Sequence, residues 1–139
     1  MVANHCNLNC MGCDHFAPVS KPWLLKKEDL EKQLKILLKQ KMETKIKNFF
    51  LLGGEPFLNP EIFDFITLIK KYFPQSGIDI ITNGILLENI SNTNLQLLKK
   101  NNAHISITHY PINCDYEEIA NKLSKNNIDW TFLHARAIF

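Results

Sequence analysis

The sequence lacks the features that would send a chain into a membrane or out of the cell. No apolar run approaches the length of a membrane span. The first six residues have neither the basic nor the apolar region of a signal peptide. Internal repeats and low-complexity linkers are also missing, and 139 residues fit one domain. We therefore predict a single cytoplasmic domain with no membrane partner.

The chain also lacks a strong excess of charge of either sign. Its net charge is +2, from 16 basic and 14 acidic residues, which is too small to imply a polyanionic partner. The most basic stretch, residues 21–47, holds nine lysines, but they do not alternate with aromatic residues as a stacking platform for bases would require. We interpret this stretch as the solvated face of a helix and expect no nucleic-acid partner.

Cysteine is scarce, with four residues in all, but three of them stand close together. Cys6, Cys10 and Cys13 have the spacing C-x3-C-x2-C. In a chain that is not secreted, such cysteines are expected to be metal ligands or core residues rather than a disulfide framework. Three thiolates on one short segment can hold three irons of a four-iron cluster, and the fourth iron is then open to a small molecule. The pattern therefore predicts chemistry at an open iron.

Two other interpretations of the cysteines are possible. One is a structural zinc site, in which the remaining ligands come from His5, Asp14, His15 or Cys114. Such sites usually pair two separated ligand clusters, and no second cluster is visible. The other is a set of buried free thiols, which fits poorly with three cysteines inside eight residues.

Short apolar runs alternate with amphipathic stretches along the chain. The strand candidates are residues 2–5, 48–52, 78–82, 104–108 and 128–133. Helical spacing occurs at residues 28–42, from the N-cap candidate Asn59 to residue 73, at 91–100, and after a capping box at Asp115 and Glu118. This order predicts an α/β fold of about five β/α units, with a parallel sheet that curls into a partial (β/α) barrel.

A polar or glycine-rich segment follows every predicted strand. These segments are residues 6–13, Gly53-Gly54-Glu55, Thr82-Asn83-Gly84, Thr108-His109-Tyr110 and His134-Ala135-Arg136. Parallel α/β folds build their sites at the carboxyl ends of their strands. The sequence therefore predicts one site at that end of the sheet.

Two of these segments resemble the motifs of a known family. The C-x3-C-x2-C run, followed one helix later by Gly53-Gly54-Glu55-Pro56, resembles the radical S-adenosylmethionine (radical SAM) superfamily. Thr82-Asn83-Gly84 resembles a further frequent element of that family, and the resemblance covers nearly the whole chain. It implies that Cys6, Cys10 and Cys13 hold a [4Fe-4S] cluster and that S-adenosylmethionine chelates the open iron.

The resemblance also implies an activity. An electron from a one-electron reductant such as flavodoxin or ferredoxin would cleave S-adenosylmethionine to methionine and a 5′-deoxyadenosyl radical. That radical would abstract hydrogen from a substrate that the sequence does not identify. The cofactors supply the difficult chemistry in such enzymes, and the protein supplies position and exclusion of water.

The resemblance assigns roles to residues beyond the cysteines. Gly53 and Gly54 allow close approach of the backbone to a ligand, and Glu55 adds negative charge beside the amino group of S-adenosylmethionine. Asn83, Ser106 and Thr108 are predicted to contact the ribose or methionine part of that cofactor, although strand polarity and turn chemistry also explain them. A further group of residues is placed to face a substrate, although a lone histidine or arginine at a strand end is more often structural: His109, Tyr110, His134 and Arg136.

The sequence departs from the family pattern in two respects. Gly12 stands where many members carry an aromatic residue before the third cysteine, which removes an expected adenine contact. The family core has six strands, whereas five are predicted here. Residues 1–139 are therefore predicted to form one core domain without its last β/α unit, in a short or truncated member. The alternative is a non-catalytic remnant that binds a metal or a partner protein. A partner that covers the unpaired edge strand of the sheet is also expected.

Overall fold

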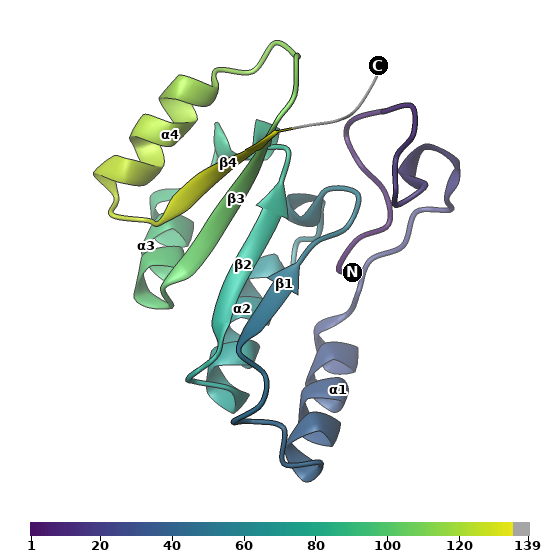
Figure 1. The fold of residues 1–139 in the computed structure, drawn as a ribbon, viewed down its shortest axis with the longest axis vertical. Coiled ribbons are helices and arrows are strands. Elements are labelled where there is room, and N and C mark those ends of the chain that lie inside the picture. The colour runs from purple at the N-terminus through teal and green to yellow at the C-terminus, as the bar shows by residue number, and fades with distance from the viewer. Residues whose placement is uncertain (135–139) are drawn as a thin grey trace.

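The computed structural model describes residues 1–134 as a parallel sheet with helices between successive strands (Figure 1). The strands are β1 (Asn48–Leu51), β2 (Gly77–Thr82), β3 (Ala103–His109) and β4 (Trp130–His134). The helices are α1 (Lys27–Lys39), α2 (Ile62–Tyr72), α3 (Asn92–Lys100) and α4 (Tyr116–Lys125). Three short 3-10 helices span Ala17–Val19, Pro56–Leu58 and Ile85–Leu87. All strand pairs are parallel, in the order β1-β2-β3-β4.

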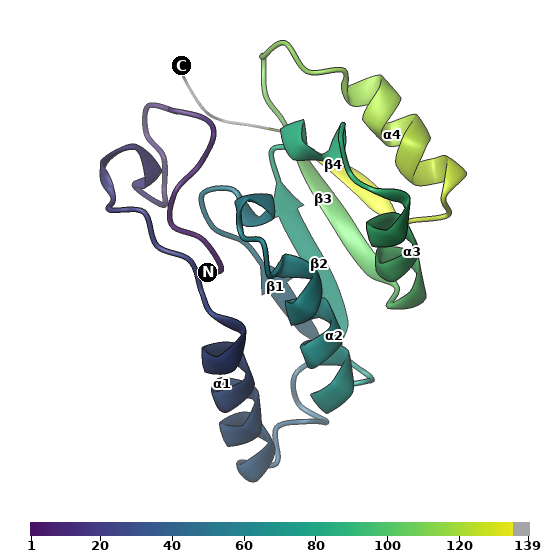
Figure 2. The ribbon, with the colours of Figure 1, turned by 180° about the vertical axis from the view of Figure 1, so that it is seen from behind.

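The helices gather on one face of the sheet, as the view from behind shows (Figure 2). Most side chains that point to this face are apolar, and those of Ile80, Ile105 and Ile107 are fully buried. Helix α2 faces them with Phe65, Ile66 and Ile69, which are fully buried as well and recur at helical spacing. The predicted α/β fold with a parallel sheet is confirmed.

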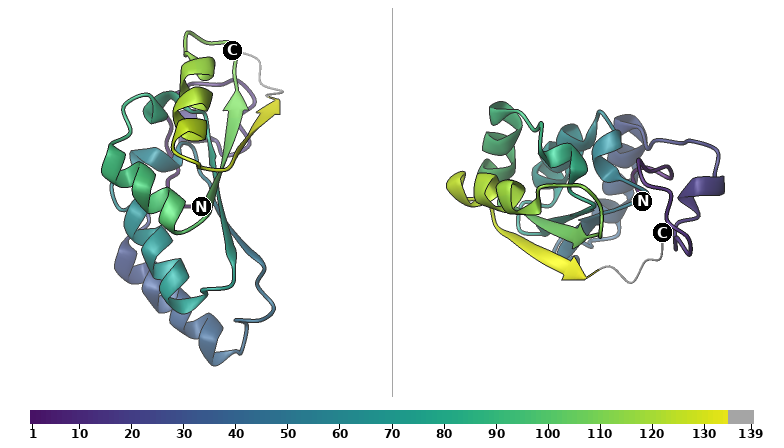
Figure 3. Two further views of the ribbon diagram at one scale, coloured as in Figure 1. Left: turned by 90° about the vertical axis from the view of Figure 1, so that its left-hand side faces the viewer. Right: turned by 90° about the horizontal axis from the view of Figure 1, so that it is seen from above.

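The opposite face of the sheet carries no helix in residues 1–134 (Figure 3). The period of two along a strand sends polar and large apolar side chains to this face. In β2 and β3 they are Asp79, Ile81, Ser106 and Thr108, and Phe50 of β1 is 54% exposed.

Two local predictions differ from the structure. Residues 2–5 do not form a strand, because Ala3 makes only isolated bridges, antiparallel to Leu24 and parallel to Gly53. Helix α2 begins at Ile62 with Glu61 as its N-cap residue, which is later than the start predicted at Asn59. The side chain of Asn59 is turned inward, where its neighbours are the N-terminal segment and the residues before α1.

Asn59 fixes the start of the chain to the body of the fold. Its Nδ2 donates to the carbonyl oxygens of Val2 and Leu25, at 2.9 Å each, and its Oδ1 accepts from the backbone N–H of Glu61 at 2.9 Å. The residue is 1% exposed, so these bonds satisfy an amide that burial would otherwise penalise.

None of the helices in the described part of the chain combines the length and the apolar character that a membrane crossing requires.

Candidate functional site

A cavity of about 580 Å³ lies at the carboxyl ends of the strands. Residues 4–23, which we call the cysteine loop, form one side of it. Residues 53–55 and 82–84, which we call the sheet edge, lie on the other side, where Gly53, Gly54, Thr82 and Asn83 line the cavity. Figure 1 shows the cysteine loop, in purple, beside the ends of β1 and β2. The cavity wall brings together seven of the nine predicted site residues: Cys6, Cys10, Cys13, Gly53, Gly54, Asn83 and Thr108.

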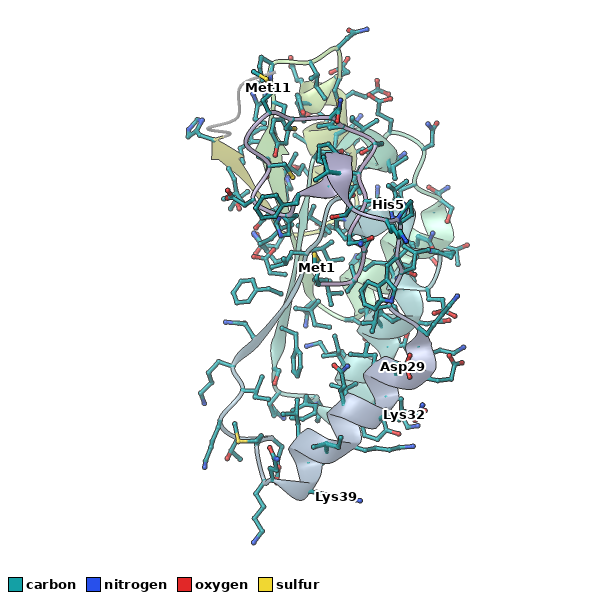
Figure 4. The ribbon with its side chains drawn as sticks, turned by 90° about the vertical axis from the view of Figure 1, so that its right-hand side faces the viewer. Met1, His5, Met11, Asp29, Lys32 and Lys39 are labelled. Carbon is teal, nitrogen blue, oxygen red and sulfur yellow. The ribbon has the colours of Figure 1, made fainter. Side chains whose placement is uncertain are left out.

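The three cysteines of the loop are free and partly buried. Burial raises the pKa of the Cys6 thiol, and burial together with the nearby Cys13 raises the pKa of the Cys10 thiol. Both sulfurs therefore keep their protons at neutral pH until a metal displaces them. Figure 4 shows Met11, on the same loop, at the opposite end of the molecule from Lys39.

The two glycines of the sheet edge allow the cysteine loop and the residues before it to approach closely. A Cβ on Gly53 would lie 2.0 Å from the carbonyl oxygen of Ala3, and one on Gly54 would lie 2.2 Å from that of His5. Backbone bonds follow this approach: Gly54 N–H donates to Ala3 and Glu55 N–H to His5, both at 2.9 Å. The absence of side chains at the two glycines thus makes room for the backbone of Ala3 and His5, and both glycines also line the cavity.

Glu55 is fully buried, and its carboxylate is occupied by the protein itself. Oε1 accepts from Thr82 Oγ1 at 2.8 Å and from Phe57 N–H at 3.1 Å, and Oε2 accepts from Asn83 N–H at 2.9 Å. Burial raises the pKa of this carboxyl, and the three donors oppose that effect. Glu55 therefore joins the turn after β1 to the turn after β2. Its predicted role beside the amino group of S-adenosylmethionine stays a prediction.

Asn83 reaches across the cavity from the sheet edge to the cysteine loop. Its Nδ2 lies 2.7 Å from Asn7 Oδ1 and 3.6 Å from Cys6 Sγ. Sequence reasoning placed Asn83 against the cofactor. The structure also gives it a contact with a predicted cluster ligand, a contact that spacing in the sequence does not reveal.

The two predicted polar residues of β3 have different surroundings. Thr108 lines the cavity. Ser106 is 4% exposed and lies outside the cavity wall, where its Oγ donates to Asp79 Oδ2 at 3.0 Å. They share a face of the strand, but Ser106 is two residues further from the carboxyl end. Ser106 therefore does not reach the cavity in this structure. Its contact with a cofactor stays a prediction.

The donor set fits an iron–sulfur cluster better than a single ion. Among residues 1–134, no three His, Cys, Asp or Glu side chains are grouped around a point where one metal ion could sit. A cluster places each thiolate on a different iron, and three thiols on the wall of one cavity match that need. Cys114, a ligand in the zinc alternative, lies just before α4. Burial, and to a smaller extent the nearby Glu88, raise the pKa of its thiol to about 11.

Comparison with known proteins decides the family. The model of the radical SAM superfamily matches residues 1–135. The chain belongs to the radical SAM superfamily. This superfamily uses a [4Fe-4S] cluster and S-adenosylmethionine, as the sequence predicted.

Curated relatives of this radical SAM chain carry the name GTP 3′,8-cyclase. The Campylobacter lari protein is 26% identical over 128 residues, which cover 91% of this chain and 37% of the relative. A probable GTP 3′,8-cyclase of Thermoplasma volcanium is 37% identical over 82 residues, covering 59% of this chain and 24% of that protein. The chain therefore spans between about a quarter and two fifths of these relatives.

Solved radical SAM structures share the fold. The anSMEcpe structure with bound AdoMet superposes with a TM-score of 0.72 at 22% identity, covering 96% of this chain and 41% of that one. BtrN in complex with AdoMet and 2-DOIA gives a TM-score of 0.67 at 20% identity, covering 96% and 54%.

The four substrate-facing candidates of this radical SAM chain differ in their positions. Tyr110 and His134 line the cavity, and burial raises the pKa of Tyr110 to about 12. His109 turns away from it and packs on the ring of Tyr116, with centroids 4.4 Å apart. Arg136 lies outside the described residues.

Sequence reasoning missed the part that Tyr116 has in the site. Its phenol donates to the carbonyl oxygen of Asn83 at 3.1 Å and accepts from the backbone N–H of Tyr110 at 3.2 Å. It lies on the buried face of α4 with Ile119 and Leu123, and it is 6% exposed. The only sequence signal for a hydrogen-bonding role was the hydroxyl of Tyr116, since a buried tyrosine usually finds a polar partner.

Proposed function

We propose that this chain holds a [4Fe-4S] cluster on Cys6, Cys10 and Cys13 and uses it to cleave S-adenosylmethionine reductively. The observation that carries the proposal is the shared cavity: three free thiols and the Gly53-Gly54 backbone line the same 580 Å³ space. Held on Cys6, Cys10 and Cys13, a reduced cluster would supply the electron for cleavage of S-adenosylmethionine to methionine and a hydrogen-abstracting 5′-deoxyadenosyl radical.

The residues of the chain contribute position and shelter. The backbone bonds to Ala3 and His5 hold the cysteine loop against the sheet edge, so that the sulfurs face the cavity. Gly53 and Gly54 line the cavity without side chains, and their carbonyl groups can accept a hydrogen bond from the amino group of S-adenosylmethionine. The hydroxyl of Thr108 adds a polar group at the end of β3.

Glu55 contributes charge from beneath the cavity floor. Its carboxylate is fully buried and accepts hydrogen bonds from the Thr82 hydroxyl and two backbone N–H groups, and no Lys, Arg or His side chain within residues 1–134 forms an ion pair with it. An ammonium group at the glycines would be attracted to this charge through a medium of low dielectric constant. This supports the predicted role of Glu55 without a direct bond to the cofactor.

Enzymes of this superfamily need a reductant and a substrate, and we propose flavodoxin or ferredoxin as the source of the electron in the cytoplasm. The relatives named GTP 3′,8-cyclase match this chain over about a quarter to two fifths of their length. We therefore propose the cofactor chemistry and name no substrate.

Anaerobic reconstitution tests the proposal. With iron and sulfide, the protein should turn brown and bind both in the ratio of a [4Fe-4S] cluster. Addition of S-adenosylmethionine and dithionite should then give 5′-deoxyadenosine. Cys10→Ala should abolish the product, whereas the matched change Cys114→Ala should retain it.

Two outcomes would contradict the proposal. A colourless protein that binds zinc would overturn the cluster. A protein that assembles the cluster and binds S-adenosylmethionine, yet forms no 5′-deoxyadenosine, would instead support the non-catalytic remnant.

A further inference from the structure

All polar groups of Asn83 are engaged, and their partners come from separate parts of the chain. Its backbone N–H donates to Glu55 Oε2 at 2.9 Å, and its carbonyl oxygen accepts from the Tyr116 phenol at 3.1 Å. The side-chain Oδ1 accepts from Ile85 N–H at 3.1 Å. With 5% of its surface exposed, Asn83 is held rigidly between β1, β2 and α4.

These bonds determine which end of the amide faces the cysteine loop. The N–H of Ile85 requires an acceptor, so the oxygen of the Asn83 amide must point to Ile85. The NH₂ group then points toward Cys6 and Asn7, and two hydrogens are available for two acceptors. The donor is therefore fixed before any metal arrives.

Cys6 Sγ receives a second N–H, from the backbone of Leu8 at 3.3 Å. Asn7 Oδ1 lies 3.7 Å from the same sulfur, and at 2.7 Å it is the nearer acceptor for the Asn83 amide. The NH₂ group of Asn83 thus has two acceptors on the loop, the Cys6 sulfur and the competing Asn7 oxygen. Removal of that oxygen would leave the sulfur as its remaining acceptor on the loop.

We propose that Asn83 is a positioning residue that donates a hydrogen bond to the Cys6 thiolate and raises the reduction potential of the cluster, with Asn7 opposing it. This inference rests on the proposed function, since it needs a cluster on Cys6. A donor aimed at a cluster sulfur stabilises the reduced state, which carries one more negative charge. Transfer of one electron to the cluster is the only redox step that the proposal concerns.

The test is a potentiometric titration of the reconstituted full chain, with the EPR signal of the reduced cluster as readout. Asn83→Leu removes the donor without adding charge, and the equilibrium constant for reduction should fall about tenfold, which corresponds to about 59 mV for one electron. Asn83→Asp adds a negative charge and should lower the potential further. Asn7→Ala should change it in the opposite direction and raise it.

Asn121→Asp is the matched control, because Asn121 is exposed on α4 and lies outside the cavity wall. It adds the same charge as Asn83→Asp and should leave the potential unchanged. Equal potentials for wild type and Asn83→Leu, both fully loaded, would overturn the inference and leave the proposed function intact.

The remaining outcomes also decide. If both Asn83 variants fail to fold, the exposed Asn7→Ala variant carries the test, and an unchanged or lower potential overturns the inference. Failure of the wild type to assemble a cluster would overturn the proposed function, and this inference with it.

Discussion

The cysteine loop and the sheet edge meet at one cavity but are built differently. The loop exposes large apolar side chains, including Met11 at 64%, Phe16 at 68% and Val19 at 82%. The sheet edge buries a carboxylate and an amide completely or nearly so, in Glu55 and Asn83. The loop therefore provides the predicted cluster ligands, whereas the buried residues of the sheet edge hold those ligands in place.

This difference separates two kinds of damage. A change in the loop removes or strains a ligand but leaves the folded sheet intact. A change at the sheet edge acts on the stability of the domain and on the position of the cysteines together. The four tests below probe this division, from the largest expected effect to the smallest.

The strongest test compares a glycine from each region. Gly53→Ala places a Cβ 2.0 Å from the Ala3 carbonyl oxygen, and backbone must shift to relieve the clash. We expect a loss of about 3 kcal/mol in the free energy of unfolding, as in overpacked cores, together with loss of the cluster. Gly12→Ala meets no atom within 4 Å and should cost about 1–2 kcal/mol, from its φ of +72° alone. Urea denaturation and iron content measure both effects, and equal losses for the two variants would contradict the division.

Asn59→Ala removes the bonds that fasten the N-terminal segment to the body of the domain. Two buried carbonyl oxygens, of Val2 and Leu25, lose their donor. We expect the free energy of unfolding to fall by about 2–3 kcal/mol. Iron content should fall as well, because residues 2–5 lead directly into Cys6. A stability loss with full cluster content would show that the cysteine loop does not depend on this anchor.

Glu55→Gln tests the buried charge through pH. Burial raises the pKa of Glu55 above its usual 4.5, so the folded chain keeps a proton that the unfolded chain has already lost. The free energy of unfolding therefore decreases as pH rises from 4.5 to the raised pKa. Glutamine cannot titrate, and its NH₂ leaves one donor unmatched, at a cost of about 1–3 kcal/mol. Urea unfolding at a series of pH values should show the deficit of the variant narrowing as pH rises, and a constant deficit would count against a titrating Glu55.

Tyr116→Phe should have the smallest effect of the four. It removes the phenol between Asn83 and Tyr110 but keeps the ring, so we expect a loss of about 1 kcal/mol in the free energy of unfolding. The exposed Lys32, paired with Asp29, supplies the matched comparison, since Lys32→Ala should change stability little. Equal melting temperatures for Tyr116→Phe and wild type would show that the phenol has no structural role.

The sequence was sufficient to predict the frame of the molecule. Apolar runs at residues 48–52 and 78–82 fell on β1 and β2, and Asp115 caps α4 through a bond to Glu118 N–H, as its spacing indicated. The convergence of the cysteines, the glycines and Asn83 on one cavity followed from the parallel order of the strands.

The directions of side chains were beyond the sequence. Residue type does not show that Glu55 turns inward to Thr82, or that Ser106 bonds Asp79 instead of facing the cavity. The same holds for Asn59, whose Oδ1 accepts from the neighbouring Glu61 N–H but whose Nδ2 donates to the distant Val2 and Leu25. In each case the partner is distant in the chain, so a local pattern carries no information about it.

The contacts that close the cavity also set an order of events. Asn7 and Asn83 are 76 positions apart, and Val2 and Asn59 are 57 apart. Contacts between such distant positions form slowly, because the entropy of closing the intervening chain must be overcome first. We therefore expect the three thiols to reach their places only after β1 and β2 have paired. Metal insertion then becomes the last step of maturation, and iron supplied to the nascent chain would meet thiols that are not yet gathered.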